Sequence, residues 1–374
     1  MNFIVSKKVF YNALTIVAGA VSHNSPLPSL TGIKIDVKDN ELILTGSDSN
    51  ISIQTRLSND TNEQLNLIVN EVGSIVIESR YIMEIVRKIE SSEITIEIVD
   101  GSLTKISGDH AEFNINGIRS TDYPLIDFTV CEQSFTLPSK TLVDIINQTT
   151  FATSDKETRP ALTGVNFKAF GNELKCIATD SYRLALKTVT LDTPNTFNIT
   201  IPAKSLNEVL KSLNEEKDIQ VAVSNKKAQF FIDTTIIQTR LINEDYPDAE
   251  RLILKDFNRF LEVDGYELLK AIDRASFIKN EGISIIKLTA SPEEVIISSR
   301  SQEVGSSEEL LDGAIYQGEP IELSFSGRYV IEALRALGNA RVKINFSGEM
   351  KQFIINSLVD ESIIQLVLPV RSYS

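Results

Sequence analysis

Three segments of this sequence share one pattern at a constant spacing, and this repeat constrains the fold more than any other feature. SRYIMEIVRKI (79–89), AKSLNEVLKSL (203–213) and GRYVIEALRAL (327–337) follow one another at intervals of 124 residues, without a gap inside any of them. In each segment the apolar residues recur at the i, i+3, i+4 and i+7 spacing that is typical of an amphipathic helix. A solenoid repeat is only ~20–50 residues long, so the repeating unit here is a whole domain.

A second match links the first two units. LTGIKIDVKDNELILTGSD (30–48) aligns with LTGVNFKAFGNELKCIATD (162–180) at an offset of 132 residues. Each copy has two apolar alternating runs around a turn, at Asp39-Asn40 or Gly171-Asn172, which predicts a β-hairpin. The third unit has a looser version at 284–299.

Each unit also opens with a predicted helix, at 6–18, 139–150 and 265–276. Ser6, Ser139 and Asp264 are the predicted N-caps of these helices. Alternating segments at 113–118, 236–242 and 363–370 are predicted to close the units as strands. The expected fold is therefore α+β, with three repeated domains at 1–127, 128–250 and 251–374, each with two helices on β-sheets.

Charge is segregated by structural element. The chain has a formal net charge of −14, which by itself argues against a nucleic-acid partner because phosphates attract Lys and Arg. On the six predicted helices, however, Lys and Arg outnumber Asp and Glu by two to one. Taken singly, each helix is explained by ordinary i, i+4 ion pairs. Six basic helices that share one concave surface would instead suit sequence-independent contact with a phosphate backbone.

The residues that commonly carry catalysis or bind metals form no recognisable motif. His23 and His110 are the two histidines, and no C-x-x-C or H-E-x-x-H spacing, phosphate-binding glycine loop or G-x-S-x-G motif is found. We therefore expect neither enzymatic activity nor a metal or other cofactor. Cys131 and Cys176 are predicted to be reduced thiols in domain cores. Asp48 and Asp180 are equivalent in the repeat, which favours a structural role in a turn over paired-carboxylate catalysis.

The N-terminal segment permits a second interpretation. Lys7-Lys8 and the apolar run after them could form a signal peptide. Asn12 and Thr15 interrupt that run, and the repeat places it inside the first domain. No apolar run reaches the ~18 residues that a membrane span needs, so no membrane partner is expected.

With the repeat in view, the whole chain resembles the family of bacterial DNA polymerase III beta subunits, the sliding clamps, and most of all those of Gram-positive bacteria. The most specific matches are LPSLTG (27–32), ETRPALTGVNF (157–167), ATDSYRLA (178–185), DYPDAERL (245–252), AIDRAS (271–276) and LVLPVRSYS (366–374). The resemblance implies a cytoplasmic, non-enzymatic head-to-tail homodimer that closes as a ring around double-stranded DNA, with helices lining the hole.

The resemblance also implies two sets of site residues. The helices would present to DNA the basic residues Lys7, Arg80, Arg87, Lys204, Lys211, Arg328 and Arg335. A pocket would bind short peptide motifs of the type Gln-Leu-x-Leu-Phe from the replicative polymerase, the clamp loader and repair proteins. Its residues would be Leu162, Thr179, Ser181, Tyr182, Arg183, Leu184, Pro247, Arg251, Leu252, Leu366, Leu368, Pro369, Val370 and Arg371. Arg183 and Arg371 have two interpretations: ordinary surface charges or, as site residues, donors of hydrogen bonds to peptide carbonyls.

Three positions depart from the family pattern. Tyr182 stands where the family usually has His, Asn24 replaces a frequent Arg that reaches DNA, and the segment before Tyr123-Pro124 is divergent. They leave open an alternative function, a divergent accessory clamp that acts as a peptide-binding adaptor with weakened DNA function.

Overall fold

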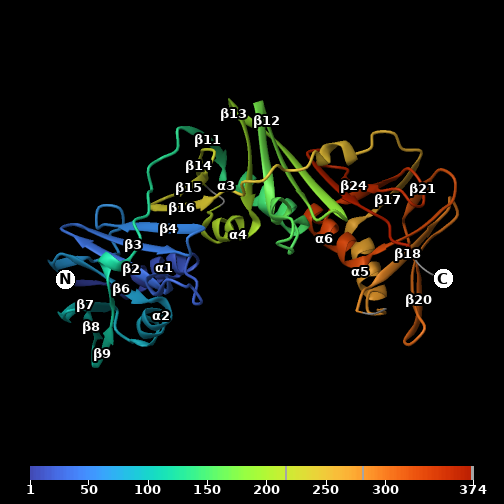
Figure 1. Cartoon of the computed structure of the whole chain (residues 1–374). Coiled ribbons are helices and arrows are strands. Elements are labelled where there is room, and N and C mark those ends of the chain that lie inside the picture. The colour runs from blue at the N-terminus through green and yellow to red at the C-terminus, as the bar shows by residue number, and fades with distance from the viewer. Residues whose placement is uncertain (215–216, 280–281, 372–374) are drawn as a thin grey trace. The chain divides into compact units, whose positions relative to one another are not determined.

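The computed structural model describes residues 1–214, 217–279 and 282–371. The chain divides into two compact units (Figure 1). One unit comprises Met1–Lys140 and Lys204–Leu241, and the other comprises Thr141–Ala203 and Ile242–Ser374. The division runs through the predicted central domain, whose strands contribute to sheets of both units.

The first unit contains two antiparallel sheets and the helices α1 (Lys7–Ala18), α2 (Ser79–Lys88) and α4 (Ala203–Ser212). Its five-stranded sheet has the order β5-β1-β7-β8-β9, and its nine-stranded sheet has the order β10-β6-β2-β3-β4-β16-β15-β14-β11. The strands are β1 (Asn2–Ser6), β2 (Gly32–Lys38), β3 (Glu41–Ser47), β4 (Ile51–Leu57), β5 (Ile68–Glu71), β6 (Gly73–Glu78), β7 (Glu93–Asp100), β8 (Leu103–Gly108), β9 (Ala111–Asn116), β10 (Ile118–Arg119), β11 (Gln133–Pro138), β14 (Asp218–Val223), β15 (Lys227–Ile232) and β16 (Thr235–Arg240).

The second unit contains α3 (Ser139–Thr149), α5 (Gly265–Ala275) and α6 (Gly327–Leu337). Its sheets have the orders β12-β13-β25-β24-β23-β17-β21 and β20-β19-β18-β22. The strands are β12 (Gly164–Thr179), β13 (Arg183–Pro202), β17 (Arg259–Asp264), β18 (Ile285–Ala290), β19 (Val295–Ser301), β20 (Gly305–Leu310), β21 (Ile315–Gln317), β22 (Ile321–Ser326), β23 (Arg341–Phe346), β24 (Phe353–Ser357) and β25 (Ile363–Val367).

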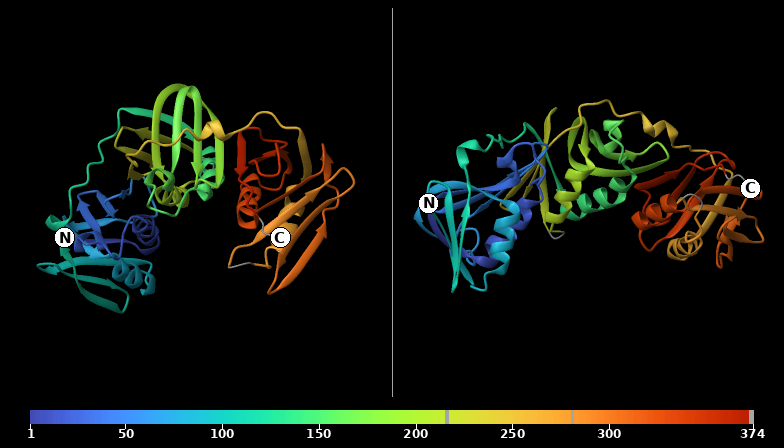
Figure 2. Two further views of the ribbon diagram at one scale, coloured as in Figure 1. Left: turned by 45° about the vertical axis from the view of Figure 1, so that its right-hand side comes forward. Right: turned by 60° about the horizontal axis from the view of Figure 1, so that its bottom comes forward.

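The helices pack in pairs against the sheets. In the first unit α1 lies beside α2 and against β3, and in the second unit α5 lies beside α6 (Figure 2). The buried stripe of α1 is Phe10, Ala13, Leu14 and Val17, at the helical spacing that the sequence predicted. Full burial of each large side chain in such a stripe contributes ~1.5–3 kcal/mol, so the sequence pattern fixes which face of each helix meets a sheet.

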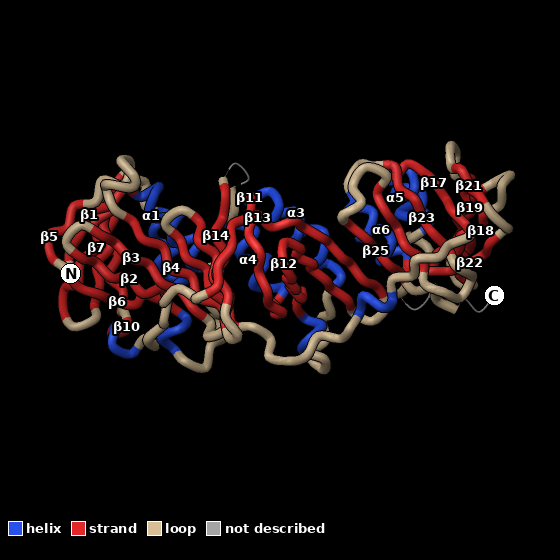
Figure 3. The backbone as a smooth tube through the Cα atoms, turned by 90° about the horizontal axis from the view of Figure 1, so that it is seen from above, coloured by secondary structure: helices blue, strands red, loops and turns tan. Residues whose placement is uncertain are grey.

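Two junctions join successive domains by pairing one sheet edge with another. β4 of the first domain pairs antiparallel with β16 of the central domain (Figure 1), with Ile51 opposite Thr239. Figure 3 draws the strands of both units in red. β13 of the central domain pairs antiparallel with β25 of the third, with Arg183 opposite Val367. Ile51 and Arg183 are separated by the 132-residue offset of the repeat, so β4 and β13 occupy equivalent places in the repeat.

The six predicted helices are confirmed within one residue at each end, but their caps differ from the prediction. Asp264 caps α5, because its carboxylate accepts hydrogen bonds from the backbone N–H groups of Tyr266 and Glu267. Ser6 occupies the N-cap of α1 without a capping hydrogen bond from its side chain. Ser139 is the first residue of α3, so its prediction as the residue before the helix was wrong by one position.

The two predicted hairpins at 30–48 and 162–180 differ in outcome. β2 and β3 form the first hairpin, with Lys38 opposite Glu41 across the predicted turn. In the second copy, residues 164–179 belong to the single long strand β12. The pairing of β12 with β13 shifts register between Gly171 and Glu173. Gly171 has φ +60°, so the predicted turn residue has a left-handed backbone that suits glycine.

No helix in the described residues is long and apolar enough to cross a lipid bilayer.

Candidate peptide-binding site and basic helix residues

A tight turn at residues 180–182 precedes β13. Oδ1 of Asp180 accepts hydrogen bonds from the backbone N–H groups of Tyr182, at 2.9 Å, and Arg183, at 3.0 Å. The hydroxyl of Thr179 donates to the carbonyl of Arg183 at 2.6 Å, and Ser181 has φ +79°. Asp48 binds the equivalent N–H groups of Asn50 and Ile51, which confirms the structural role predicted for both aspartates. The turn presents the ring of Tyr182 to solvent, 58% exposed.

Beside this turn lies an apolar cluster that draws on distant parts of the second unit. Its buried members are Ile177, Leu184, Leu186, Ala249, Ile354 and Leu366, and Tyr246, Ile253, Phe257, Ile364 and Leu368 pack against it. Strand pairing sets Leu184 opposite Leu366, and the N–H of Leu368 donates to the carbonyl of Tyr182 at 2.9 Å. The structure therefore brings together three of the predicted site residues, Leu184, Leu366 and Leu368.

The remaining predicted residues differ in their environments. Leu162 and Thr179 are buried, Ser181, Pro247 and Arg371 are exposed, and Pro369 and Val370 are half-buried. Arg251 is exposed and pairs with Asp248 at 2.6 Å. Leu252 is 51% exposed, and its carbonyl accepts a hydrogen bond from Gln352. An exposed leucine and an exposed tyrosine near a buried apolar cluster give a surface on which an apolar peptide side chain can dock.

Arg183 does not lie at the surface as the sequence interpretation expected. Its side chain is 5% exposed. Nε donates to Asp180 at 3.0 Å, Nη1 donates to Glu332, and Nη2 donates to the carbonyl of Phe151. Its guanidinium also lies over the rings of Phe151 and Tyr329, at 5.2 and 4.6 Å from their centroids. These contacts direct the donors of Arg183 into the protein and away from the carbonyls of a bound peptide.

Glu332 of α6 is the shared acceptor of two arginines. Oε2 accepts from Arg183 and Oε1 accepts from Nε of Arg328 at 3.0 Å. Burial raises the pKa of Glu332, but the hydrogen bonds from both arginines outweigh it and hold the pKa below its usual range. Glu332 also lines a cleft of about 520 Å³ between α3 and α6, with Asn147, Gln148, Phe151 and Arg335 among its walls. The Arg183 network thus extends from the turn beside the apolar cluster to this cleft.

The predicted DNA-facing residues are exposed with one exception. Arg80, Arg87, Lys204, Lys211, Arg328 and Arg335 are all exposed. Arg87 pairs with Glu84, and Lys211 with Glu208, on their own helices. Lys7 is half-buried, and its Nζ donates to the carbonyls of Arg87 and Ile89 at the C-terminal end of α2. Because unpaired carbonyls and the dipole make a helix C-terminus attract cations, the contacts of Lys7 are those of a structural residue.

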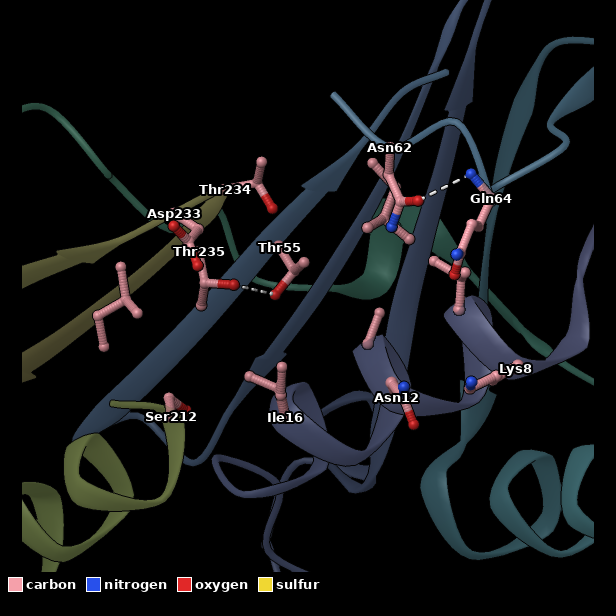
Figure 4. A pocket seen from close by; sticks show the side chains of 14 residues that line it. Lys8, Asn12, Ile16, Thr55, Asn62, Gln64, Ser212, Asp233, Thr234 and Thr235 are labelled. Atoms are coloured by element: carbon pink, nitrogen blue, oxygen red, sulfur yellow. Dashed lines mark hydrogen bonds between the residues drawn. The ribbon is translucent and has the colours of Figure 1, made fainter. Parts of the chain in front are cut away.

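The first unit has a separate cavity of about 270 Å³ at its sheet junction (Figure 4). Lys8, Asn12 and Ile16 of α1 form one side, and Thr55, Thr234 and Thr235 lie on another. Thr55 and Thr235 share a hydrogen bond of 2.9 Å across the β4–β16 pairing. None of the predicted site residues lines this cavity.

Sequence reasoning missed several residues of the apolar cluster, among them Ile177, Tyr246, Phe257 and Ile354. Tyr246 had a signal, since Asp-Tyr-Pro occurs at both 122–124 and 245–247, and burial raises the pKa of its phenol. Glu332 lies in the helical repeat segment 327–337, but nothing in the sequence indicates that it reaches Arg183. Cys131 and Cys176 are buried free thiols, as predicted. Within the described ranges no group of three or more His, Cys, Asp or Glu is arranged to hold a metal ion.

The fold corresponds to that of a known family. Residues 1–127, 136–248 and 250–371 match the N-terminal, central and C-terminal domains of the DNA polymerase III beta subunit. The chain is 38% identical to the beta sliding clamp of Bacillus subtilis (strain 168), and 37% identical to that of Staphylococcus aureus (strain Mu50), over the full length of both chains in each case.

Solved structures give the same result. The crystal structure of the DNA polymerase sliding clamp from Bacillus subtilis matches with a TM-score of 0.95 at 38% identity, covering 100% of both chains. The DNA polymerase III beta chain from Streptococcus pneumoniae TIGR4 matches with a TM-score of 0.95 at 31% identity, covering 99% of this chain and 100% of the other. The chain belongs to the DNA polymerase III beta subunit family, the beta sliding clamps, and consists of three clamp domains.

Proposed function

We propose that two copies of this chain close head to tail into a ring around double-stranded DNA, without reading its sequence. The ring confers processivity on the replicative polymerase and recruits the polymerase, the clamp loader and repair proteins through short peptide motifs. In this proposal the protein is a tether and not an enzyme. The domain boundaries follow the repeat, at 1–127, 128–250 and 251–374.

The observation that carries the ring is the equivalence of the two sheet junctions. In each junction the second strand of one hairpin meets the second strand of another. β4 of the β3–β4 hairpin meets β16 of β15–β16, and β13 of the β12–β13 hairpin meets β25 of β24–β25. The same rule assigns β20 of the third domain to β9 of a first domain. Both are terminal strands of their sheets, and exposed backbone at a sheet edge is a template for pairing with another chain. Two chains that pair β20 with β9 in both directions form a closed C2 dimer.

Light scattering tests the dimer. We expect twice the chain mass of 41.5 kDa at micromolar concentration. A Pro substitution in the middle of β9, Asn114→Pro, removes a donor from the pairing edge and should shift the population toward monomer. The matched control is Asn70→Pro in β5, at the other edge of the same sheet, which should leave the mass unchanged. A wild-type monomer at these concentrations would contradict the ring.

The apolar cluster and the exposed Tyr182 and Leu252 support the peptide site. A short extended peptide that buries two apolar side chains there should bind in the micromolar range, about −7 to −9 kcal/mol. Val370 donates its N–H to the carbonyl of Ser324, and this contact holds the C-terminal segment beside the third domain. We expect deletion of residues 370–374 to weaken binding of a fluorescent Gln-Leu-Ser-Leu-Phe peptide in an anisotropy titration. Equal affinity for both proteins would place the client site elsewhere.

A circular-plasmid assay separates the clamp from the accessory adaptor that the sequence left open. A ring that encircles DNA remains on a closed circle and falls off when the circle is linearised. An adaptor binds the peptide but shows no such dependence on topology. The comparisons with sliding clamps give no support to the adaptor.

A further inference from the structure

The buried ion network behind the turn at 180–182 has no assigned part in peptide binding. Arg183 follows the exposed Tyr182 and precedes Leu184 of the apolar cluster, so its backbone belongs to the candidate site. Its side chain instead points inward, to Asp180, Glu332 and the carbonyl of Phe151. One guanidinium therefore connects the turn, α6 and the segment after α3.

The network leaves the turn little freedom. Asp180 holds the turn's backbone N–H groups through Oδ1 and the Arg183 side chain through Oδ2. Glu332 holds the far end of the same guanidinium and is itself held by Arg328. Charge-assisted hydrogen bonds of this kind are stronger than neutral ones, and a planar arginine fork fixes their direction. A turn that is fixed before a peptide arrives loses less conformational entropy on binding.

We propose that Glu332 is a positioning residue of the peptide site: through Arg183 it sets the turn that carries Tyr182, and so determines the affinity and ranking of bound peptides without touching them. This inference rests on the peptide site of the proposed function. The occupant is a short peptide with apolar anchors, and Glu332 acts from the side of α6, 24% exposed.

The repeat supplies a matched control. Glu84 occupies the position in α2 that Glu332 occupies in α6, but it pairs with Arg87 at 2.8 Å and Lys88 at 3.2 Å on its own helix. Glu84→Gln and Glu332→Gln thus remove the same charge from equivalent helices. Only the second change reaches the turn.

The experiment uses the full chain and the fluorescent Gln-Leu-Ser-Leu-Phe peptide, with hydrogen exchange of the backbone amides at 181–184 as a second readout. We expect Glu332→Gln to weaken the peptide about fivefold, because a neutral acceptor replaces a charged one, and to speed exchange at these amides. Glu332→Asp should recover part of both effects. The affinity ratio of two peptides that differ only in the residue flanking the anchors should also shift, which a general loss of stability would not cause. Glu84→Gln should change none of these quantities.

A second variant covers the case in which Glu332→Gln does not fold, as judged by thermal melting. Arg183→Lys keeps the charge but loses the fork, and should give the same weakened binding and faster exchange. If the wild type binds the peptide and Glu332→Gln binds it equally with unchanged exchange, the positioning role is wrong and the peptide site stands. If the wild type does not bind, the peptide site itself is wrong and the positioning role falls with it.

Discussion

The helices α2 and α6 come from the same repeat, yet their glutamates have different partners. Both have a basic residue, a glutamate four positions later and an arginine three after that. Glu84 of α2 is 51% exposed and pairs with neighbours on its own helix. Glu332 of α6 is half as exposed and reaches Arg183, 149 residues away in sequence. The same local pattern is a surface ion pair in one domain and part of a buried network in the other.

The difference shows what a repeat can determine. It fixes the helix, its apolar face and its place on the sheet, because these depend on residues inside the unit. It does not fix the partners of the polar face, because they belong to whatever packs beside that face. α6 packs beside the turn at 180–182 and has a buried arginine to pair with. The candidate peptide site is therefore a property of a domain junction and not of the domain repeat.

The largest expected effect comes from removing Arg183. Arg183→Ala leaves Asp180 and Glu332 without their shared partner, and breaking such a buried pair should lower the free energy of unfolding by about 3 kcal/mol. Arg80→Ala, in α2, removes an exposed arginine that pairs with Glu78 and should cost less than about 0.5 kcal/mol. Urea denaturation followed by circular dichroism measures both. Equal costs would mean that the buried network around Glu332 contributes no more to stability than the exposed ion pair of α2.

Most of the fold could be predicted from the sequence because the repeat presents each helix pattern in three aligned copies. The helix at 203–213 alone is an ordinary amphipathic segment, but its copies at 79–89 and 327–337 fix its type and its ends. The long-range pairing of Thr55 with Thr235 could not be predicted. It depends on two sheet edges meeting, and the alternation within a strand does not say which strand lies next to it.

The site was only partly predictable, for a related reason. Leu184, Leu366 and Leu368 were placed together through the family resemblance, and the structure brings them into one cluster. The predicted orientation of Arg183 was wrong, because the sequence does not distinguish an arginine that faces a ligand from one that faces a buried carboxylate. Burial decides between these, and burial of a polar side chain follows from tertiary packing that the sequence pattern does not contain.

The opening helices of the first and third domains allow a smaller test of the same comparison. Asp264 caps α5 with two hydrogen bonds, whereas Ser6 at the start of α1 makes none with its side chain. Asp264→Ala should therefore lower the free energy of unfolding by about 1 kcal/mol, and Ser6→Ala by only about 0.2 kcal/mol. Shifts of the urea midpoint report both values. A cost for Ser6→Ala that matched that of Asp264→Ala would show that position, and not the hydrogen bonds, sets the stability of these helix starts.

The smallest effects are expected for DNA, where α2 and α6 should again be alike. Arg80 and Arg328 are both exposed, and each would contact a phosphate at most. Arg80→Glu or Arg328→Glu should each shorten retention on closed circular DNA about two- to threefold at low salt and lower the salt slope by about 1. The two variants should differ in the peptide-binding assay instead, because only Arg328→Glu places a second carboxylate beside Glu332. Retention is measured on two circles of unrelated sequence after loading by the cognate clamp loader. If either variant changed the preference between the two circles, contact with the backbone alone would not describe how the protein holds DNA.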